Sequence, residues 1–285
     1  MAKGNLLLGT AKNSVGDVVM YRREGAQITR VRVRNVKNPK TDAQSFQRAI
    51  MAPIAKFYSP LSVVLERSFE GLSKAKSHNK FNQVNANLAR ANKWALPKGT
   101  GFFPLPYQLS QGTLQSVYCS SFGAGEGFLF GTGRAPEEMT TVGHLSAYFH
   151  SNGFQNGDVV TFIAVSKTTN GKISSYSPVA SQFMIDDTSD ELLTNALKEI
   201  TIKIEGGPMR FLAQLGSTVA GAVIVSRFDG TMWRRSTQSL ALDADIITAV
   251  TADAAVAAAI ASYGMTAGDG NPLVYLDGDE LADGQ

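Results

Sequence analysis

Three short turn sequences, each flanked by stretches of alternating side chains, constrain the fold of this chain most. They are Glu24-Gly25, Asn170-Gly171 and Asp229-Gly230. An Asn-Gly, Asp-Gly or similar pair between two such stretches favours a two-residue β-hairpin turn, because these residues tolerate a positive φ. The sequence therefore predicts three antiparallel hairpins, one near the N-terminus and two in the second half of the chain.

The first predicted hairpin, residues 17–36, has two chemically different faces. Successive side chains of a strand point to opposite faces of the sheet. One face carries Arg30, Arg32 and Arg34 with Tyr21, and the other carries Val18, Met20, Val31 and Val33. We expect the valine face to pack in a core and the arginine face to bind anions.

A helical segment is predicted next. Thr41, followed three residues later by Gln44, has the form of a helix capping box. Pro53 and Pro60 are expected to kink or end this first helix, because proline lacks the N–H that a helix interior uses. A second helix at about 60–70, a basic loop at 74–80 and a third helix at about 81–95 are expected to follow.

Residues 113–243 read as turn-separated strands, which favours an antiparallel β-sandwich of the immunoglobulin or fibronectin kind. Residues 143–150 alternate and are predicted to form a strand, with His144 and His150 exposed on one face. Thr251 is expected to cap an alanine-rich helix at 252–262, and an acidic tail follows from residue 269. The predicted fold class is α+β, with domains at 1–100 (basic hairpin and helices), 101–243 (β-sandwich) and 244–285 (helix and tail).

Charge is divided unevenly along the chain. The first 100 residues carry eighteen Lys and Arg against five Asp and Glu, a net charge of +13, and the remaining 185 have a net charge of −10. Such a division favours a polyanionic partner, or head-to-tail packing between copies.

Several classes of protein are disfavoured. Cys119 is the single cysteine, so no internal disulfide or cysteine-based zinc site is expected, and we expect it to be a small buried residue. No apolar stretch approaches the roughly 20 residues of a membrane helix, and the N-terminal apolar run is too short for a signal peptide. We therefore expect no membrane partner, and a location in a host cytoplasm or a virion.

The arginine face is the best candidate binding site. Neighbouring guanidinium groups repel one another unless anions lie between them, and each can bind a phosphate through two N–H groups. A second basic cluster accompanies the third helix. Together the predicted nucleic-acid-binding residues are Lys12, Tyr21, Arg22, Arg23, Arg30, Arg32, Arg34, Lys37, Lys40, Lys76, Lys80, Arg90, Lys93 and Trp94. The alternatives are a strand edge protected by charge, a subunit interface, or, for the second cluster, a solvated helix face.

No motif indicates catalysis. The glycine-rich segments 123–127 and 131–134 lack the context of a phosphate-binding loop and are read as flexible loops. Glu137-Glu138 and Asp186-Asp187 are adjacent pairs whose side chains should diverge. Trp233-Arg234-Arg235 either extends a basic surface or combines an anchoring Trp with two solvated arginines. We predict no enzyme activity, no cofactor and no metal.

Three segments resemble an uncharacterised protein family of gut Bacteroidota and the phages found with them. They are residues 9–34, residues 38–49 (Asn-Pro-Lys-Thr-Asp-Ala-Gln and Gln-Arg-Ala), and residues 223–238 (Val-Ile-Val-Ser-Arg and Trp-Arg-Arg-Ser-Thr-Gln). The resemblance implies the order hairpin, helices and sandwich, and a phage origin. It supplies no activity and no site residues.

The leading hypothesis is a phage-encoded, non-enzymatic protein that binds nucleic acid, single-stranded DNA in particular, through the basic hairpin. The alternative is a virion structural protein of the capsid, neck or tail. In that case the basic and acidic halves of neighbouring copies pack together, so that the partners are further copies or other phage proteins.

Overall fold

The computed structural model describes residues 13–15, 17–23, 26–32, 41–91, 102–131, 139–170, 173–204, 209–251 and 254. The chain forms two compact units, residues 1–45 and 46–285. The fold is α+β, with an N-terminal hairpin, helices, several packed antiparallel sheets and a short C-terminal helix, as predicted. The predicted domain boundary near residue 100 falls in segment 92–101, outside the described residues.

The N-terminal unit contains a three-stranded antiparallel sheet of β1 (Asn13–Val15), β2 (Val18–Arg23) and β3 (Ala26–Val31). Arg23 pairs with Ala26, which leaves a two-residue connection and confirms the predicted hairpin. The valine face is not buried within the described residues, since Val31 is 74% exposed. Three short strands offer too little apolar surface to form a core of their own.

Helix α1 (Asp42–Leu65) is one continuous helix, so neither Pro53 nor Pro60 ends it, and the separate helix predicted from residue 60 is wrong. The predicted cap is confirmed, because the Gln44 backbone N–H donates to Thr41 Oγ1 at 3.4 Å. The helix buries one apolar side, including Ile50, Ile54, Phe57, Leu61 and Leu65. Burial of five such side chains outweighs a cost of about 3 kcal/mol for each interior proline.

The predicted basic loop is also helical, as part of α2 (Lys74–Val84), and α3 (Ala86–Ala91) follows after an interruption at Asn85. The buried Asn85 side chain explains the interruption. Its amide donates to the Phe81 and Gln108 carbonyls at 3.0 Å each, and its oxygen accepts from the Gln108 N–H at 2.9 Å. Asn85 therefore binds the backbone of Gln108, in β4 (Gln108–Ser110), to the helices.

A five-stranded antiparallel sheet occupies the middle of the C-terminal unit. It comprises β12 (Trp233–Arg235), β11 (Ser217–Phe228), β7 (Val159–Asn170) and β8 (Ile173–Met184), with β14 (Ala241–Leu242) also paired to β11. The pairs Asn170–Ile173 and Phe228–Trp233 confirm both predicted hairpins of the second half.

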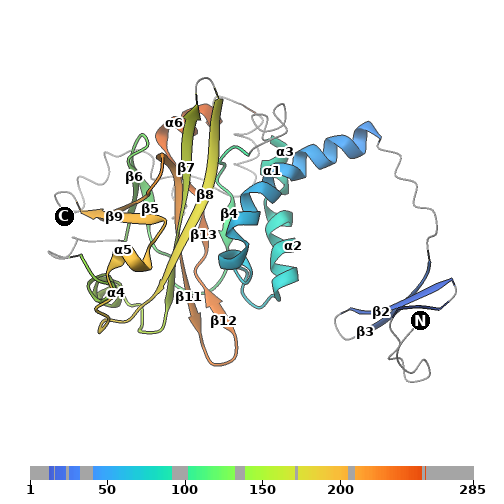
Figure 1. The fold of residues 1–285 in the computed structure, drawn as a ribbon, viewed down its shortest axis with the longest axis horizontal. Helices are drawn as coiled ribbons and strands as arrows, with labels where there is room; N and C mark the ends of the chain where they lie inside the picture. The colour runs from blue at the N-terminus through green and yellow to red at the C-terminus, as the bar shows by residue number, and fades with distance from the viewer. Residues whose placement is uncertain are drawn as a thin grey trace. The chain divides into compact units, whose positions relative to one another are not determined.

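Hydrophobic cores lie on both faces of this sheet because β7 and β11 alternate apolar side chains between them. Ile163 of β7 and Ile224 of β11 face helices α1–α3. Phe162 and Val223 face the opposite core. Figure 1 shows the helices on one side of β7 and β8, and β5, β6, β9, α4 and α5 on the other.

The second core is covered by a four-stranded sheet and two helices. The sheet has the order β5 (Cys119–Gly123), β6 (Gly127–Phe130), β10 (Met209–Ala213) and β9 (Ile200–Ile204), and the helices are α4 (Val142–Ser151) and α5 (Leu193–Ala196). A short pair, β4 with β13 (Gln238–Ser239), joins the helical side to the sheet. The predicted strand at 143–150 is therefore wrong.

Helix α4 forms because the apolar residues that look alternate also follow helical spacing. Val142, Leu145 and Phe149 are all buried on one side. Thr141 caps the helix by accepting from the His144 N–H at 3.4 Å. The two histidines are consequently not neighbours on an exposed strand face, and His150 instead lies 3.7 Å from Asp187.

The described C-terminal helix, α6 (Ala244–Thr251), begins earlier than predicted. Asp243 Oδ1 accepts from the Asp245 N–H at 3.0 Å and so caps it. Thr251 lies in this helix, so its predicted role as a cap is wrong. The alanine-rich segment, apart from residue 254, and the acidic tail lie outside the described residues.

Two smaller predictions are resolved by burial and hydrogen bonding. Cys119 is buried, as expected, and burial raises the pKa of its thiol. The glycine-rich segment 123–127 is not a flexible loop, because it forms the tight turn between β5 and β6, where the Gly125 N–H donates to Asp243 at 2.5 Å. Asp186 and Asp187 diverge as predicted, the first binding Thr188 and the second Asn156.

Candidate functional site

The arginine face of the N-terminal hairpin forms as its sequence predicted. The register places Tyr21 beside Ile28, and Val19 beside Arg30, all on one face. The Arg30 guanidinium carbon lies 5.7 Å from the centroid of the Tyr21 ring, in a cation–π contact. Arg32 directly follows β3 and, being two residues after Arg30, lies on the same face. The face therefore combines an accessible ring with two cations.

The exposure of these groups suits a binding surface. Tyr21, Arg22, Arg30 and Arg32 are exposed, although Arg22 shares the opposite face with Met20. Among the residues that the structure describes, no carboxylate forms an ion pair with these three arginines. Arg23 lies in β2, but its side chain is outside the description, as are Lys12, Arg34, Lys37, Lys40, Lys93 and Trp94.

The described members of the second basic cluster lie in two helices. Lys76 and Lys80 belong to α2, with Lys74 beside them, and Arg90 belongs to α3. Lys74 binds Glu66 at the end of the preceding segment. Lys80 lines a cleft, whereas Arg90 is exposed and does not line it.

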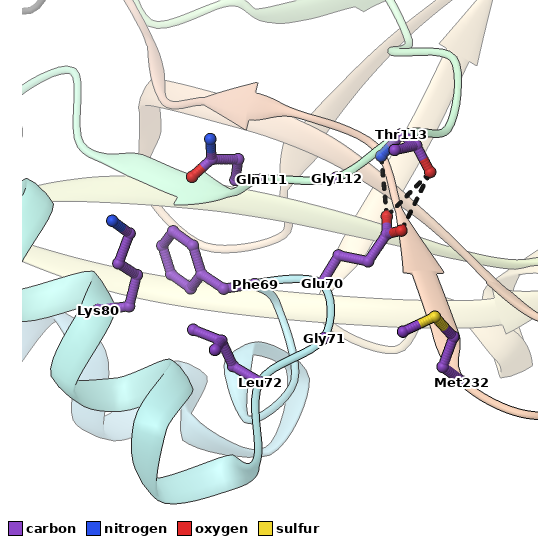
Figure 2. A pocket seen from close by; sticks show the side chains of 9 residues that line it. All are labelled: Phe69, Glu70, Gly71, Leu72, Lys80, Gln111, Gly112, Thr113 and Met232. Atoms are coloured by element: carbon purple, nitrogen blue, oxygen red, sulfur yellow. Dashed lines mark hydrogen bonds between the residues drawn. The ribbon is translucent and has the colours of Figure 1, made fainter.

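This cleft, of about 510 Å3, lies around the turn at residues 69–72. It is lined by Phe69, Glu70, Gly71, Leu72, Lys80, Gln111, Gly112, Thr113 and Met232. Figure 2 shows Lys80, Gln111 and the Phe69 ring on the side of the cleft away from Met232. The Glu70 carboxylate is directed to Thr113. The walls come from four separate segments of the chain: residues 69–72, residue 80, residues 111–113 and residue 232.

Glu70 is a structural carboxylate of this cleft. It accepts hydrogen bonds from the Thr113 N–H at 2.9 Å and from Arg234 at 2.6 Å. Desolvation raises the pKa of Glu70, but the hydrogen bonds from Arg234 and Thr113 outweigh it and hold the pKa below its ordinary value. Glu70 is thus ionised, and its oxygens already accept hydrogen bonds from Thr113 and Arg234. A carboxylate bound in this way does not suit the role of a general base.

A second cleft, of about 410 Å3, adjoins the first and shares Phe69, Gly71, Leu72 and Met232 with it. Its remaining lining residues are Arg67, Ser73, Lys74, Phe228, Thr231 and Trp233. Phe228 is 53% exposed, and its ring centroid lies 5.5 Å from that of Trp233. This cleft is therefore bordered by aromatic rings and by two cationic side chains.

The segment Trp233-Arg234-Arg235 matches neither predicted alternative, because Arg234 is ion-paired to two carboxylates of the protein and Arg235 is buried. Arg234 binds Glu70 and Asp229 at 2.6 and 2.8 Å. Arg235 is 9% exposed and donates to the Arg67 carbonyl at 3.1 Å. Desolvation, followed by repulsion from Arg67, lowers the pKa of Arg235 to about 10.

Sequence reasoning missed Arg67, Phe228 and Met232 as cleft residues. No local signal identifies them, since they lie in segments far apart in sequence that meet through the packing of the 67–74 turn against the β11–β12 hairpin.

Comparison with known proteins connects these elements to a family. Residues 9–112 match a family described as a family of unknown function, DUF6266. The chain carries a DUF6266 domain. The match contains the N-terminal hairpin, helices α1–α3 and part of the wall of the first cleft, whereas Phe228 and Trp233 lie beyond it. No curated protein and no solved structure matches the chain.

Two features are absent from the residues that the structure describes. No helix there is long and apolar enough to cross a membrane. No group of three or more His, Cys, Asp or Glu side chains in the described part is placed to hold a metal ion.

The turn that carries Met232 depends on an ionised Asp229. Hydrogen bonds from the N–H groups of Met232 and Thr231, and then from Arg234, lower the pKa of Asp229 from 3.8 to about 2. A depressed pKa means that the carboxylate stabilises the fold above pH 3.8, and that this contribution is lost as the pH falls toward 2. We expect the Met232 and Thr231 amide resonances to shift together in that window in an NMR titration. The Asp229→Asn variant should lack the step, and a midpoint near 4 would contradict the prediction.

Proposed function

We propose that this protein binds single-stranded nucleic acid, single-stranded DNA in particular, through the arginine face of its N-terminal hairpin, and that it does no chemistry on it. The observation that carries the proposal is the exposed Tyr21 ring with Arg30 against it and Arg32 next along the strand. Proteins that bind single strands combine aromatic platforms for bases with cations for phosphates.

The charge of the N-terminal unit supports the same reading. Residues 1–45 contain nine Lys and Arg against three Asp and Glu. In the described part of the hairpin, the exposed guanidinium groups of Arg30 and Arg32 have no carboxylate bound to them. A phosphate between neighbouring guanidinium groups removes their mutual repulsion and gains charge-assisted hydrogen bonds.

The origin proposed for the protein is a phage of gut Bacteroidota, on the resemblance of its hairpin, helical and Trp-Arg-Arg segments. A phage protein of this kind acts in the cytoplasm of the infected host or is packaged in the virion. It works without a cofactor, and as an oligomer or beside other phage proteins.

Binding is tested with the full chain and a fluorescent oligonucleotide of thymidines. We expect binding at 50 mM salt that weakens by about 7-fold at 200 mM, as two neutralised phosphates of a single strand require. Changing Arg30 and Arg32 together to Gln should remove most of the salt dependence. Changing the exposed Lys198 to Gln should not. Absence of binding at low salt would overturn the proposal.

A second function, virion assembly, is favoured by the valine face of the same hairpin. Val31 is 74% exposed, and Val18 and Met20 are half-buried, so this face offers apolar surface to another chain. If copies assemble through it, light scattering of the nucleic-acid-free protein gives a mass of several chains. Val31→Glu then returns the mass to that of one chain. A single-chain mass for the unmodified protein excludes this function.

A further inference from the structure

We propose that the cleft between residues 67–74 and the β11–β12 hairpin binds one nucleotide of the same strand, with its base against Phe228 and Trp233 and its phosphate at Arg67. The inference rests on the proposed function for the class of its ligand. It adds a second contact point, in the C-terminal unit. The two rings of this site, Phe228 and Trp233, lie beyond the part of the chain that matches DUF6266.

The rings form an accessible edge of the cleft. Phe228 is the last residue of β11 and is 53% exposed, and it pairs with Trp233, the first residue of β12. The two ring planes are inclined by 49° at a centroid separation of 5.5 Å. The Arg235 guanidinium carbon lies 5.4 Å from the centroid of the Trp233 ring, in a cation–π contact. Every nucleobase has a π face, so such rings bind bases without regard to sequence.

The opposite edge is cationic. Arg67 and Lys74 are both exposed, and the buried Arg235 donates to the Arg67 carbonyl. The carboxylates nearby already have cationic partners, since Glu66 binds Lys74, and Glu70 and Asp229 bind Arg234. Repulsion between Arg67 and Arg235 is one cause of the lowered pKa of Arg235. A phosphate at Arg67 would relieve that repulsion.

The dimensions and the neutral groups of the cleft fit this ligand. A volume of about 410 Å3 is within the range of small-molecule sites, about 300–1,000 Å3. The hydroxyl groups of Ser73 and Thr231 line it and offer donors and acceptors without charge. The adjoining cleft of Figure 2, with Lys80 on its far side, continues the same surface through Phe69 and Met232.

Trp233 is itself the reporter for the test. The chain has two tryptophans, so Trp94→Phe in the full-length protein leaves Trp233 as the only one. The probe is a ten-nucleotide thymidine strand added at 50 mM salt. We expect quenching of the Trp233 fluorescence on binding, because a stacked base quenches indole emission. Because Trp233 itself is not substituted, the measurement does not depend on whether a variant at this position folds.

Two substitutions with matched controls complete the test. Phe228→Ala should weaken binding by about 5- to 150-fold, the range measured for loss of one base–aromatic stack, and Phe46→Ala, at a ring of similar exposure, should leave it unchanged. Arg67→Gln should reduce the slope of log affinity against log salt by about 0.7, and Lys198→Gln should not. Melting curves of all four variants confirm that each is folded.

The outcomes separate this inference from the proposed function. The cleft inference alone is overturned if Trp233 is not quenched and Phe228→Ala binds normally, while the hairpin variants bind weakly. Weak binding by Phe228→Ala with normal binding by the hairpin variants supports the cleft and overturns the hairpin proposal. No binding by the unmodified chain overturns both the hairpin proposal and the cleft inference. A protein segment would then be the ligand to test for the cleft.

Discussion

Replacing Arg227 with methionine is expected to lower the free energy of unfolding by about 3–5 kcal/mol, because it leaves a buried carboxylate without its cation. Asp158, which precedes β7, has a side chain only 1% exposed. Arg227 of β11 donates to both of its oxygens at 2.6 Å, and the Gln155 N–H donates to one at 2.9 Å. Denaturant unfolding followed by circular dichroism measures the change.

The matched control for this prediction removes the stranded charge. In the double variant Arg227→Met with Asp158→Asn, no carboxylate is left buried, so part of the lost stability should return. The single variant Lys167→Met, at a half-exposed position of the neighbouring strand, should change stability little. A loss below about 1 kcal/mol for Arg227→Met would show that water reaches Asp158 and that the pair contributes little.

Replacing Asn85 with alanine is expected to cost about 2–4 kcal/mol, since it leaves the N–H and carbonyl of the half-buried Gln108 without their Asn85 partners. Asn85 joins α2 and α3 to β4, and those helices share one core with β7 and β11. We therefore expect helix and sheet signals to disappear together, at a lower denaturant concentration than in the unmodified protein.

Asn87 supplies the comparison for Asn85, because it is the same residue type in α3 but exposed. Asn87→Ala should change stability by no more than about 0.5 kcal/mol. Two separate unfolding transitions in the Asn85→Ala variant would contradict the shared core. A similar, small effect of both substitutions would show that the hydrogen bonds of Asn85 to Gln108 do not stabilise the fold.

Much of the local structure was predictable because it depends on neighbouring residues. The Glu24-Gly25, Asn170-Gly171 and Asp229-Gly230 turns each join a hairpin, and Thr41 caps α1. Turn and cap preferences act over three or four residues, so they are readable directly. The pairing of Tyr21 with the arginine face followed from the same turn, since the two-residue connection determines the register.

The errors occurred where packing outweighed local preference. Pro53 and Pro60 lie inside α1 because its apolar side is buried against a sheet that is distant in sequence. Residues 142–151 satisfy both a strand pattern and a helix pattern, and the core beneath Leu145 and Phe149 selects the helix. Short apolar patterns of this kind do not distinguish the two periods by themselves.

The candidate sites divide in the same way. The sequence alone determined the hairpin with its row of arginines, because strand alternation and turn chemistry operate within about twenty neighbouring residues. Only the tertiary structure decided that Arg234 and Arg235 are engaged internally, and that Arg67 meets Phe228 and Trp233 at one cleft. Arg67 is more than 150 positions from Phe228 and Trp233. They are brought together by the burial of apolar surface between helices and sheet, a non-directional force that no short segment encodes.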